Sequence, residues 1–324
     1  MLKQKTILLA PTGRAAKVLS SYANHPAFTI HKKIYRQKSF ADESASFSIC
    51  DNLNKHTLFL VDEASMISNE GLSGNMFGSG RLLDDLIQYV YSGEGCRLLI
   101  LGDTAQLPPV GEEQSPALSA MMLAGYGLEV MEANLTQVVR QAESSGILWN
   151  ATALRKLLVQ DECYSLPKIR ITGFPDVKVV PGNELMEALE ACYDNDGLEE
   201  TIVVCRSNKR ANIYNNGIRS RILWREDELN NGDLLMIAKN NYYWTEQEKD
   251  MDFIANGELA VVQRVRRQSE LYGFRFVDVT LTFPDQDNYE LDANLLLDTL
   301  QSESPALTRA DADRLFNAVL EDYA

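Results

Sequence analysis

The sequence lacks three features that would each point to a class of protein. It has no apolar run of the roughly 18 residues that cross a bilayer, and the apolar stretch near its start is too short for a secretory signal. Its five cysteines form no C-x-x-C pair, and its three histidines have no spacing typical of metal ligands. We therefore expect a cytoplasmic protein with no membrane partner, no disulfide scaffold and no zinc site.

Acidic residues are missing from the sequence before Asp42, although the whole chain carries a net charge of −15. An acidic protein is a poor candidate for nucleic-acid binding, because lysine and arginine drive the binding of phosphates. Three basic clusters oppose that argument, and they lie within residues 3–38, 206–225 and 264–267. Segregated charge can form a local positive path on an acidic protein, or the clusters can be ordinary solvated helix faces.

Short apolar runs alternate with helical patterns in the first part of the chain. The runs at residues 7–10, 58–61 and 98–101 are apolar throughout, as are strands of a parallel sheet that are covered on both faces. Helical patterns follow at residues 13–22 and 81–91. This order predicts an α/β fold in which helices cover both faces of a parallel sheet.

The second part of the chain changes its pattern twice. After a helical pattern at residues 147–158, an apolar run at 201–205 and a helical pattern at 208–223 predict a second strand-helix unit. Residues 232–282 are rich in β-forming segments separated by turn residues, which predicts a small all-β insertion. The tail then returns to a helical pattern.

Two adjacent carboxylates, Asp62 and Glu63, follow the apolar run at residues 58–61. In open α/β sheets, ligands bind beyond the carboxyl ends of the strands. One carboxylate at such a place can hold Mg²⁺, directly or through water, while the next orients or deprotonates the water that attacks a γ-phosphate. The alternative is that the pair only caps the following helix.

The apolar run at residues 98–101 leads into the stretch GDTAQLPPVG. Gly102 allows a sharp turn after the strand, and Pro108 and Pro109 hold the segment extended and stiff. Gln106 is thereby presented on a rigid loop, where its amide can contact a γ-phosphate oxygen or a water molecule without competing for a proton. A proline-stiffened turn with a surface glutamine is the alternative.

These motifs together resemble those of the superfamily 1 DNA helicases of the RecD-like, Dda-like and Pif-like branch, which move 5′ to 3′ on single-stranded DNA. The stretch ILLAPTGRAAKVL is similar to helicase motif Ia, LFLVDEAS to motif II and LLILGDTAQLPPVG to motif III. The stretch LTQVVRQ resembles motif IV, and GDLLMIAKNNY and FIANGELAVV resemble the SH3-like insertion of this branch. The resemblance covers nearly the whole chain.

The resemblance implies a P-loop NTPase fold with RecA-like domains and gives a role to each motif. Asp62 and Glu63 would serve Mg²⁺ and the attacking water during ATP hydrolysis, and Gln106 would couple the γ-phosphate to DNA. Arg140 would reach the nucleotide, because its charge is permanent and its planar fork matches phosphate oxygens. An ion pair with a nearby acid is the alternative for Arg140.

In motif Ia, backbone groups and small polar side chains would contact DNA phosphates without reading the sequence. The residues in these positions are Pro11, Thr12, Gly13 and Arg14. His31, just after motif Ia, either faces DNA as well or is an ordinary structural residue.

The resemblance also predicts the domain organisation. We expect a partial first RecA-like domain at residues 1–143 with a hairpin insertion at about 36–56, the first part of a second RecA-like domain at 144–230, the SH3-like insertion at 231–285 and a helical return segment at 286–324.

The sequence lacks the Walker A loop of the family, and it has no credible motif V or VI. The Walker A loop, G-x-x-x-x-G-K-[ST], cradles the phosphates of ATP, and no segment of this chain contains it. The stretch TRA at residues 308–310 mimics motif VI, but it lies at the start of a polar helix. We therefore expect an internal fragment of a helicase that hydrolyses ATP negligibly by itself. Another P-loop ATPase, and a non-catalytic nucleic-acid-binding or scaffold module, are the alternatives.

Overall fold

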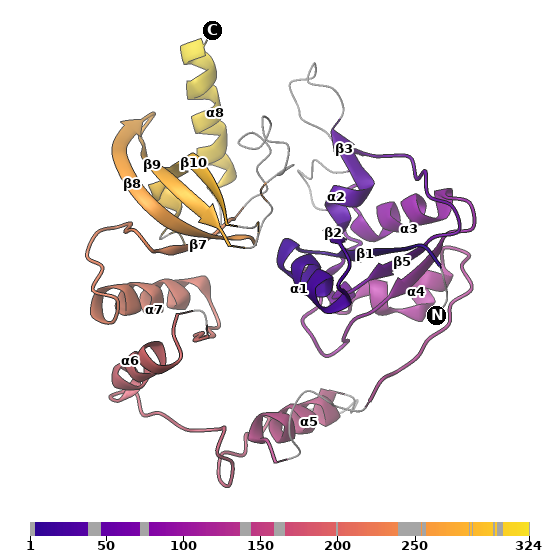
Figure 1. The fold of residues 1–324 in the computed structure, drawn as a ribbon, viewed down its shortest axis with the longest axis horizontal. Coiled ribbons are helices and arrows are strands. Elements are labelled where there is room, and N and C mark those ends of the chain that lie inside the picture. The colour runs from indigo at the N-terminus through magenta and orange to yellow at the C-terminus, as the bar shows by residue number, and fades with distance from the viewer. Residues whose placement is uncertain are drawn as a thin grey trace. The chain divides into compact units, whose positions relative to one another are not determined.

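A computed structural model shows how the chain folds (Figure 1). It describes residues 4–37, 47–71, 78–136, 144–158, 166–198, 200–238, 254, 257–284, 286, 288–300, 302 and 307–323. The chain forms two compact units, of which the first contains Met1–Pro11 and Ala15–Gly182 and the second contains Thr12–Arg14 and Asn183–Ala324. No helix in the described part of the chain is both long and apolar enough to cross a membrane.

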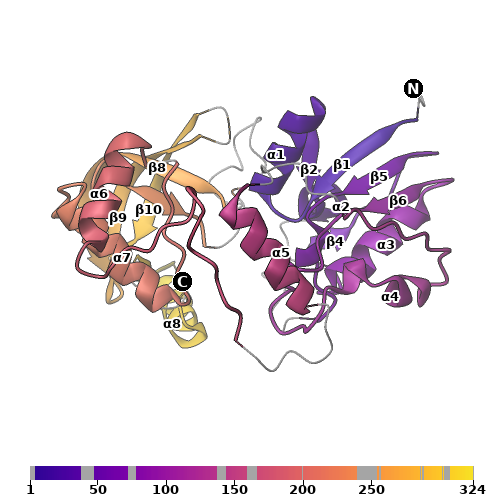
Figure 2. The same ribbon diagram turned by 90° about the horizontal axis from the view of Figure 1, so that it is seen from below.

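A parallel sheet forms the centre of the first unit, as predicted, and it has four strands, of which β2 (Ala27–Thr29) was not predicted. Its strands are β1 (Thr6–Ala10), β2 (Ala27–Thr29), β5 (Leu58–Val61) and β6 (Arg97–Ile100), in the order β2-β1-β5-β6. The helices α1 (Gly13–Ala23) and α3 (Leu82–Ser92) connect β1 to β2 and β5 to β6. Because such crossovers are right-handed and lead in opposite directions from the centre, they place α1 and α3 on opposite faces of the sheet, as Figures 1 and 2 show.

The apolar residues of the two central strands form the core of this unit. Leu9, Phe59 and Val61 are completely buried. The prediction that all three apolar runs are covered on both faces is wrong for β6, since Leu99 is 42% exposed and Leu101 is 39% exposed. The reason is that β6 lies at the edge of the sheet in the described residues, where it has a neighbouring strand on one side only.

A hairpin insertion follows β2. It contains α2 (Ile30–Ile34) and the antiparallel strands β3 (Tyr35–Gln37) and β4 (Phe47–Ile49). Its tip, residues 38–46, lies outside the described residues. The hydroxyl of Tyr35 donates a hydrogen bond of 2.7 Å to the buried carboxylate of Asp85 on α3, which fixes the base of the insertion to the unit.

The remaining helices of the first unit are α4 (Ala120–Ala124) and α5 (Gly146–Leu158). The side chain of Arg155 on α5 forms an ion pair with Asp103, with 2.5 Å between Nη2 and Oδ2. The first unit extends to Gly182, whereas we expected a domain boundary after residue 143.

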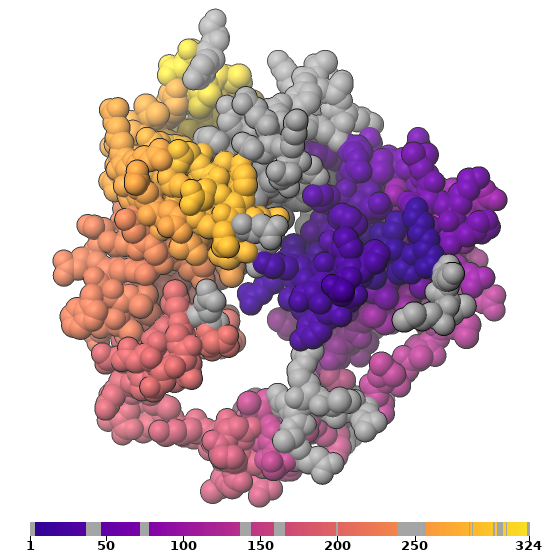
Figure 3. All heavy atoms as spheres, in the orientation of Figure 1, coloured from indigo at the N-terminus to yellow at the C-terminus, as the bar shows by residue number. Residues whose placement is uncertain are grey.

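The second unit begins with α6 (Leu185–Asn195), which we did not predict, and continues with the predicted helix α7 (Asn208–Arg221). The apolar run at residues 201–205 was expected to form a strand, but the structure assigns no strand there. Ile202 and Val204 are 85% and 86% exposed. A strand needs a hydrogen-bonded neighbour, and the described residues supply none for this run. Figure 3 shows the atoms of both units in the colours of chain order.

A four-stranded antiparallel sheet completes the second unit. Its strands are β7 (Leu234–Met236), β8 (Leu259–Leu271), β9 (Phe274–Phe283) and β10 (Tyr289–Leu296), in the order β10-β9-β8-β7. The prediction of a β-rich region at residues 232–282 is confirmed for the strands β7 to β9. The prediction of a helical segment at 286–324 is wrong for β10 and right for α8 (Arg309–Tyr323).

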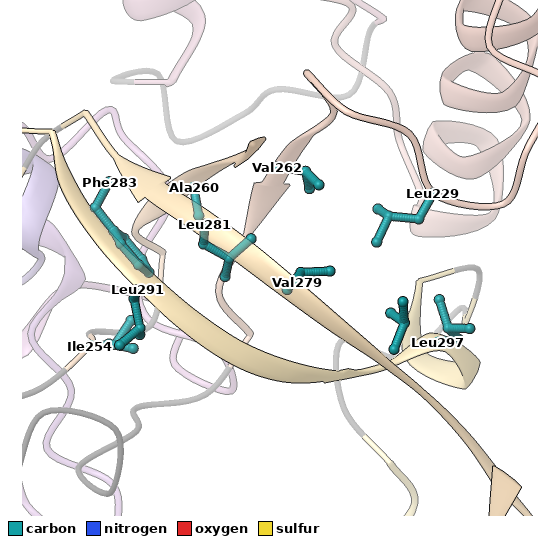
Figure 4. Close-up of a cluster of buried hydrophobic side chains, with 10 residues drawn as sticks. Leu229, Ile254, Ala260, Val262, Val279, Leu281, Phe283, Leu291 and Leu297 are labelled. Carbon is teal, nitrogen blue, oxygen red and sulfur yellow. The ribbon is translucent and has the colours of Figure 1, made fainter. Parts of the chain in front are cut away.

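The core of this sheet comes from the alternation of side chains along the strands (Figure 4). Val277, Val279, Leu281 and Phe283 of β9 all point to one buried cluster. The other members of the cluster are Leu229, Ile254, Ala260, Val262, Leu291 and Leu297. The helix α8 is tied to the β8–β9 turn, because the guanidinium of Arg314 lies 4.6 Å from the ring centre of Phe274.

Candidate functional site

The two predicted carboxylates lie at the carboxyl end of β5, in a turn that the neighbouring strands hold in place. The backbone N–H of Asp62 donates to the carbonyl of Leu9 on β1 (3.0 Å), and that of Ala64 donates to the carbonyl of Leu101 after β6 (2.9 Å). The Oδ1 atom of Asp62 accepts a hydrogen bond of 2.9 Å from the N–H of Glu63. Both carboxylates are half-buried at the edge of the sheet where ligands of α/β proteins bind.

Glu63 has a strained backbone. Its φ of 52° and ψ of 38° place it in the left-handed region, which costs a residue with a side chain about 1–3 kcal/mol. Such conformations persist where the surrounding structure fixes them, and they cluster at functional sites. The hydrogen bonds of Asp62 and Ala64 on either side hold this conformation and thereby aim the Glu63 side chain.

Gln106 is brought to the same turn by a hydrogen bond. The hydroxyl of Ser65, which is 1% exposed, donates to Oε1 of Gln106 over 3.0 Å. The amide nitrogen of Gln106 keeps its two N–H donors, for which no acceptor is found among the residues that the structure describes. We did not predict a role for Ser65 from the sequence, although its hydroxyl follows the two carboxylates in the same turn.

The loop that carries Gln106 is anchored at both ends. At one end, the Asp103 carboxylate accepts from the N–H of Ala105 (2.9 Å) and pairs with Arg155. The backbone hydrogen bond from Ala105, followed by the contact with Arg155, lowers the pKa of Asp103 against the opposing effect of burial. At the other end, Glu112 accepts from the hydroxyl of Ser68 (2.5 Å). Contacts at Asp103 and Glu112 thus anchor the loop on both sides of Gln106.

The reason for Gly102 differs from the one we expected. Its φ is not positive, so the turn does not need the conformational freedom of glycine. A Cβ atom at this position would lie 2.9 Å from the side chain of Leu118 and 3.2 Å from the backbone nitrogen of Ser65. Glycine avoids these tight contacts at a point where the backbone passes close to the carboxylate turn.

The predicted DNA-contacting residues follow β1 directly. Because β1 pairs with β5 in parallel, with Leu9 opposite Val61, the segment after Ala10 starts from the same edge of the sheet as the carboxylate turn. Pro11, Thr12 and Gly13 are half-buried and Arg14 is exposed. α1 begins at Gly13, so the first backbone N–H groups of this helix belong to the predicted phosphate contacts.

His31 is more buried than a residue that contacts DNA needs to be. Its ring centre is 5.6 Å from that of Tyr35. Burial lowers the pKa of His31 to about 4, against the opposing charge of Asp85, so the imidazole is neutral at pH 7. A neutral, half-buried ring offers phosphate little attraction, which favours the structural interpretation. The remaining predicted site residue, Arg140, lies outside the described residues.

Comparisons with known proteins agree with this geometry. Residues 2–160 match the family described as AAA domain. Over 148 residues, covering 45% of this chain, the sequence is 32% identical to the ATP-dependent RecD2 DNA helicase of Deinococcus radiodurans, of which it covers 17%. It is also 26% identical over 276 residues to an uncharacterized protein, R530, of Acanthamoeba polyphaga mimivirus; that match covers 76% of this chain and 52% of the relative.

The parallel sheet with a carboxylate turn at its carboxyl edge, together with the AAA-domain match over residues 2–160, is the fold of a P-loop NTPase domain. Within that class of fold, the chain is similar to a RecD2 DNA helicase over part of its length. The chain spans about a sixth of the first relative and about half of the second.

Proposed function

We propose that this chain is the nucleotide- and DNA-contacting part of a cytoplasmic helicase, which couples ATP hydrolysis to 5′-to-3′ movement on single-stranded DNA. The observation that carries the proposal is the hydrogen bond between Ser65 and Gln106. It joins the carboxylate turn to a loop whose glutamine amide can donate to the γ-phosphate and to its surroundings. In this proposal, closure of the site around ATP changes the grip on DNA.

The donor set of the turn fits a magnesium nucleotide. Mg²⁺ prefers carboxylate and water oxygens, and Asp62 uses one carboxylate oxygen for Glu63 while its other oxygen has no protein partner among the described residues. Asp62 would hold Mg²⁺ directly or through water, and the ion would neutralise charge on the phosphates. Glu63 would orient and deprotonate the attacking water, Gln106 would donate to the γ-phosphate, and Arg140 would stabilise the charge of the transferring group.

The first test is ATP hydrolysis. The chain contains no G-x-x-x-x-G-K-[ST] segment, the loop that cradles the β- and γ-phosphates in P-loop ATPases. We expect phosphate release at the background rate, with or without single-stranded DNA, and no change in Glu63→Gln. Turnover that DNA stimulates and Glu63→Gln abolishes would contradict this prediction.

The second test is the salt dependence of DNA binding. We expect weak binding of a labelled oligothymidylate, with an affinity that falls steeply as salt rises. If Arg14 contacts a phosphate, Arg14→Ala should reduce the slope of log K against log salt by about 0.7, the value for one contact with a single strand. Arg97→Ala is the matched control, because Arg97 is also exposed but begins β6 at the opposite edge of the sheet.

Fluorescence anisotropy at several salt concentrations measures these slopes. Equal slopes for wild type and Arg14→Ala would remove Arg14 from the DNA path. The non-catalytic alternative would be favoured if the protein encoded by the natural reading frame binds DNA but has no Walker A loop.

A further inference from the structure

A cluster of one arginine and two aromatic rings lies far along the chain from the carboxylate turn. The guanidinium of Arg170 is 5.4 Å from the ring centre of Trp149 on α5 and 5.1 Å from that of Phe174. The two rings lie 6.2 Å apart with 38° between their planes. No motif that we identified in the sequence includes these three residues, which we call the aromatic platform.

A buried amide fixes the arginine of the platform. Asn150 is 8% exposed, and its Nδ2 atom donates to the carbonyls of Gly146 and Arg170 over 2.8 Å each. Its Oδ1 atom accepts from the N–H of Arg170, also over 2.8 Å. Both backbone polar groups of Arg170 are thus held by one side chain, which fixes the backbone from which the guanidinium reaches the two rings.

The Phe174 side of the platform is held just as firmly. A Cβ atom on Gly146 would lie 2.5 Å from Cγ of Phe174, so the ring packs directly on the first turn of α5. Two residues further on, Asp176 accepts hydrogen bonds from the hydroxyl of Ser145 (2.7 Å) and the N–H of Gly146 (2.9 Å). These bonds lower the pKa of Asp176, and they direct its charge to the helix start.

The platform is nevertheless open to solvent. The Trp149 side chain is 43% exposed and Arg170 is exposed as well. An indole that served only a local core would be buried, since the burial of its large apolar surface is what stabilises such a core. A rigid, exposed ring beside a fixed cation is instead the arrangement on which flat, electron-rich groups stack.

The two segments that carry the platform have a positive net charge, in contrast to the chain as a whole. The exposed cations of α5 and of residues 166–182, apart from the paired Arg155, are Lys156, Lys168, Arg170 and Lys178. The one carboxylate in these two segments is Asp176, which caps α5. Residues 159–165, which include Asp161 and Glu162, lie outside the described residues. Exposed lysines in the same segments as a stacking surface suit a ligand that carries both bases and phosphates.

We propose that the aromatic platform binds single-stranded nucleic acid by stacking one base on Trp149, while the neighbouring cations contact the flanking phosphates. This inference extends the proposed function and rests on it. A single strand is the partner because its bases are free to stack on a side chain, whereas those of a duplex are stacked on one another. The contact is tolerant of sequence, since every base has a stacking face.

The test compares variants that keep an apolar side chain at position 149 and differ in whether that side chain is a flat ring. We expect Trp149→Leu to lower the affinity for a labelled oligothymidylate about tenfold, in line with the loss of one stacked base. Trp149→Phe should restore most of the affinity. Trp224→Ala is the matched control, because Trp224 is 79% exposed and lies in the second unit, and it should bind as wild type does.

An abasic strand of the same length separates stacking from charge. Wild type and Trp149→Leu should bind it equally, and the salt slope of Trp149→Leu should equal that of wild type. The platform would be overturned if Trp149→Leu bound the oligothymidylate as tightly as wild type does. It would also be overturned if this substitution weakened binding of the abasic strand as much as binding of the oligothymidylate. Either result would leave the proposed function intact. Failure of wild type to bind either strand would overturn both.

Discussion

Asp233→Ala is expected to lower the free energy of unfolding by about 3–5 kcal/mol, the cost of removing one partner from a buried ion pair. Asp233 is 4% exposed and pairs with Arg219 (2.9 Å) and Arg225 (2.7 Å). It also accepts a hydrogen bond of 2.7 Å from the N–H of Asn230. The carboxylate thereby ties α7 to the start of the antiparallel sheet, and its removal leaves two guanidinium groups without their shared partner.

Hydrogen exchange of the β8 and β9 amides measures this loss, because these strands exchange through opening of the second unit. Asp292→Asn is the control: Asp292 also pairs with an arginine, Arg266 (2.9 Å), but its side chain is 60% exposed. A solvated pair contributes little, so exchange should barely change. Equal acceleration in Asp233→Ala and Asp292→Asn would contradict the prediction.

The contribution of Asp233 to the free energy of unfolding should also depend on pH. Burial raises the pKa of Asp233, but the hydrogen bonds from Arg219, from the backbone of Asn230 and from Arg225 outweigh burial and hold the pKa below its usual value. A carboxylate with a depressed pKa stabilises the fold above the unfolded value of about 3.9. That contribution is lost as the pH falls through the folded pKa. The stability difference between wild type and Asp233→Asn should therefore be full at pH 7 and shrink below about pH 4.

Phe59→Ala is expected to destabilise the first unit by a similar amount, about 3–5 kcal/mol. Phe59 is completely buried in β5 and meets Tyr89 of α3 edge to face, with ring centres 5.9 Å apart. Loss of the ring removes apolar burial and leaves a cavity between the sheet and α3. Since β5 leads directly into Asp62, the same change should loosen the carboxylate turn.

Hydrogen exchange of β1 and β5 gives the measurement, and the two variants serve as controls for each other. Phe59→Ala should accelerate exchange in β1 and β5 more than in β9, and Asp233→Ala should do the reverse. Phe59→Leu keeps much of the volume and should cost less than Phe59→Ala, about 1.5 kcal/mol or below. Slow exchange of β5 in Phe59→Ala would show that the ring does not hold this part of the core.

Local sequence patterns were sufficient for the elements whose structure depends on local rules. The apolar runs predict β1, β5 and β6 to within one residue, and the β-rich stretch FRFVDVTLTF coincides with β9. The strand β10 was missed although its signal is present. Tyr289, Leu291 and Ala293 alternate with charged residues, which is the pattern of a half-buried strand.

Other features could not be predicted because they depend on residues far apart in the sequence. The apolar run at residues 201–205 looks like a strand, but pairing decides whether it becomes one. The exposure of Leu99 follows from the position of β6 at the edge of the sheet. The buried cluster of Asp233 with two arginines is likewise invisible in composition, since charged residues are normally expected on the surface.

By itself, the sequence determined the order of strands and helices in the parallel sheet, the carboxylates at the end of β5 and the loop with Gln106. These follow from hydrophobic patterning and from the fixed geometry of proline. Tertiary structure alone decided that Ser65 holds Gln106, that Glu63 adopts a strained backbone and that Arg170 lies between two rings. Each of these is a contact or a conformation imposed by segments that meet only after folding. Chain-local preferences of about 1 kcal/mol or less per residue cannot specify them.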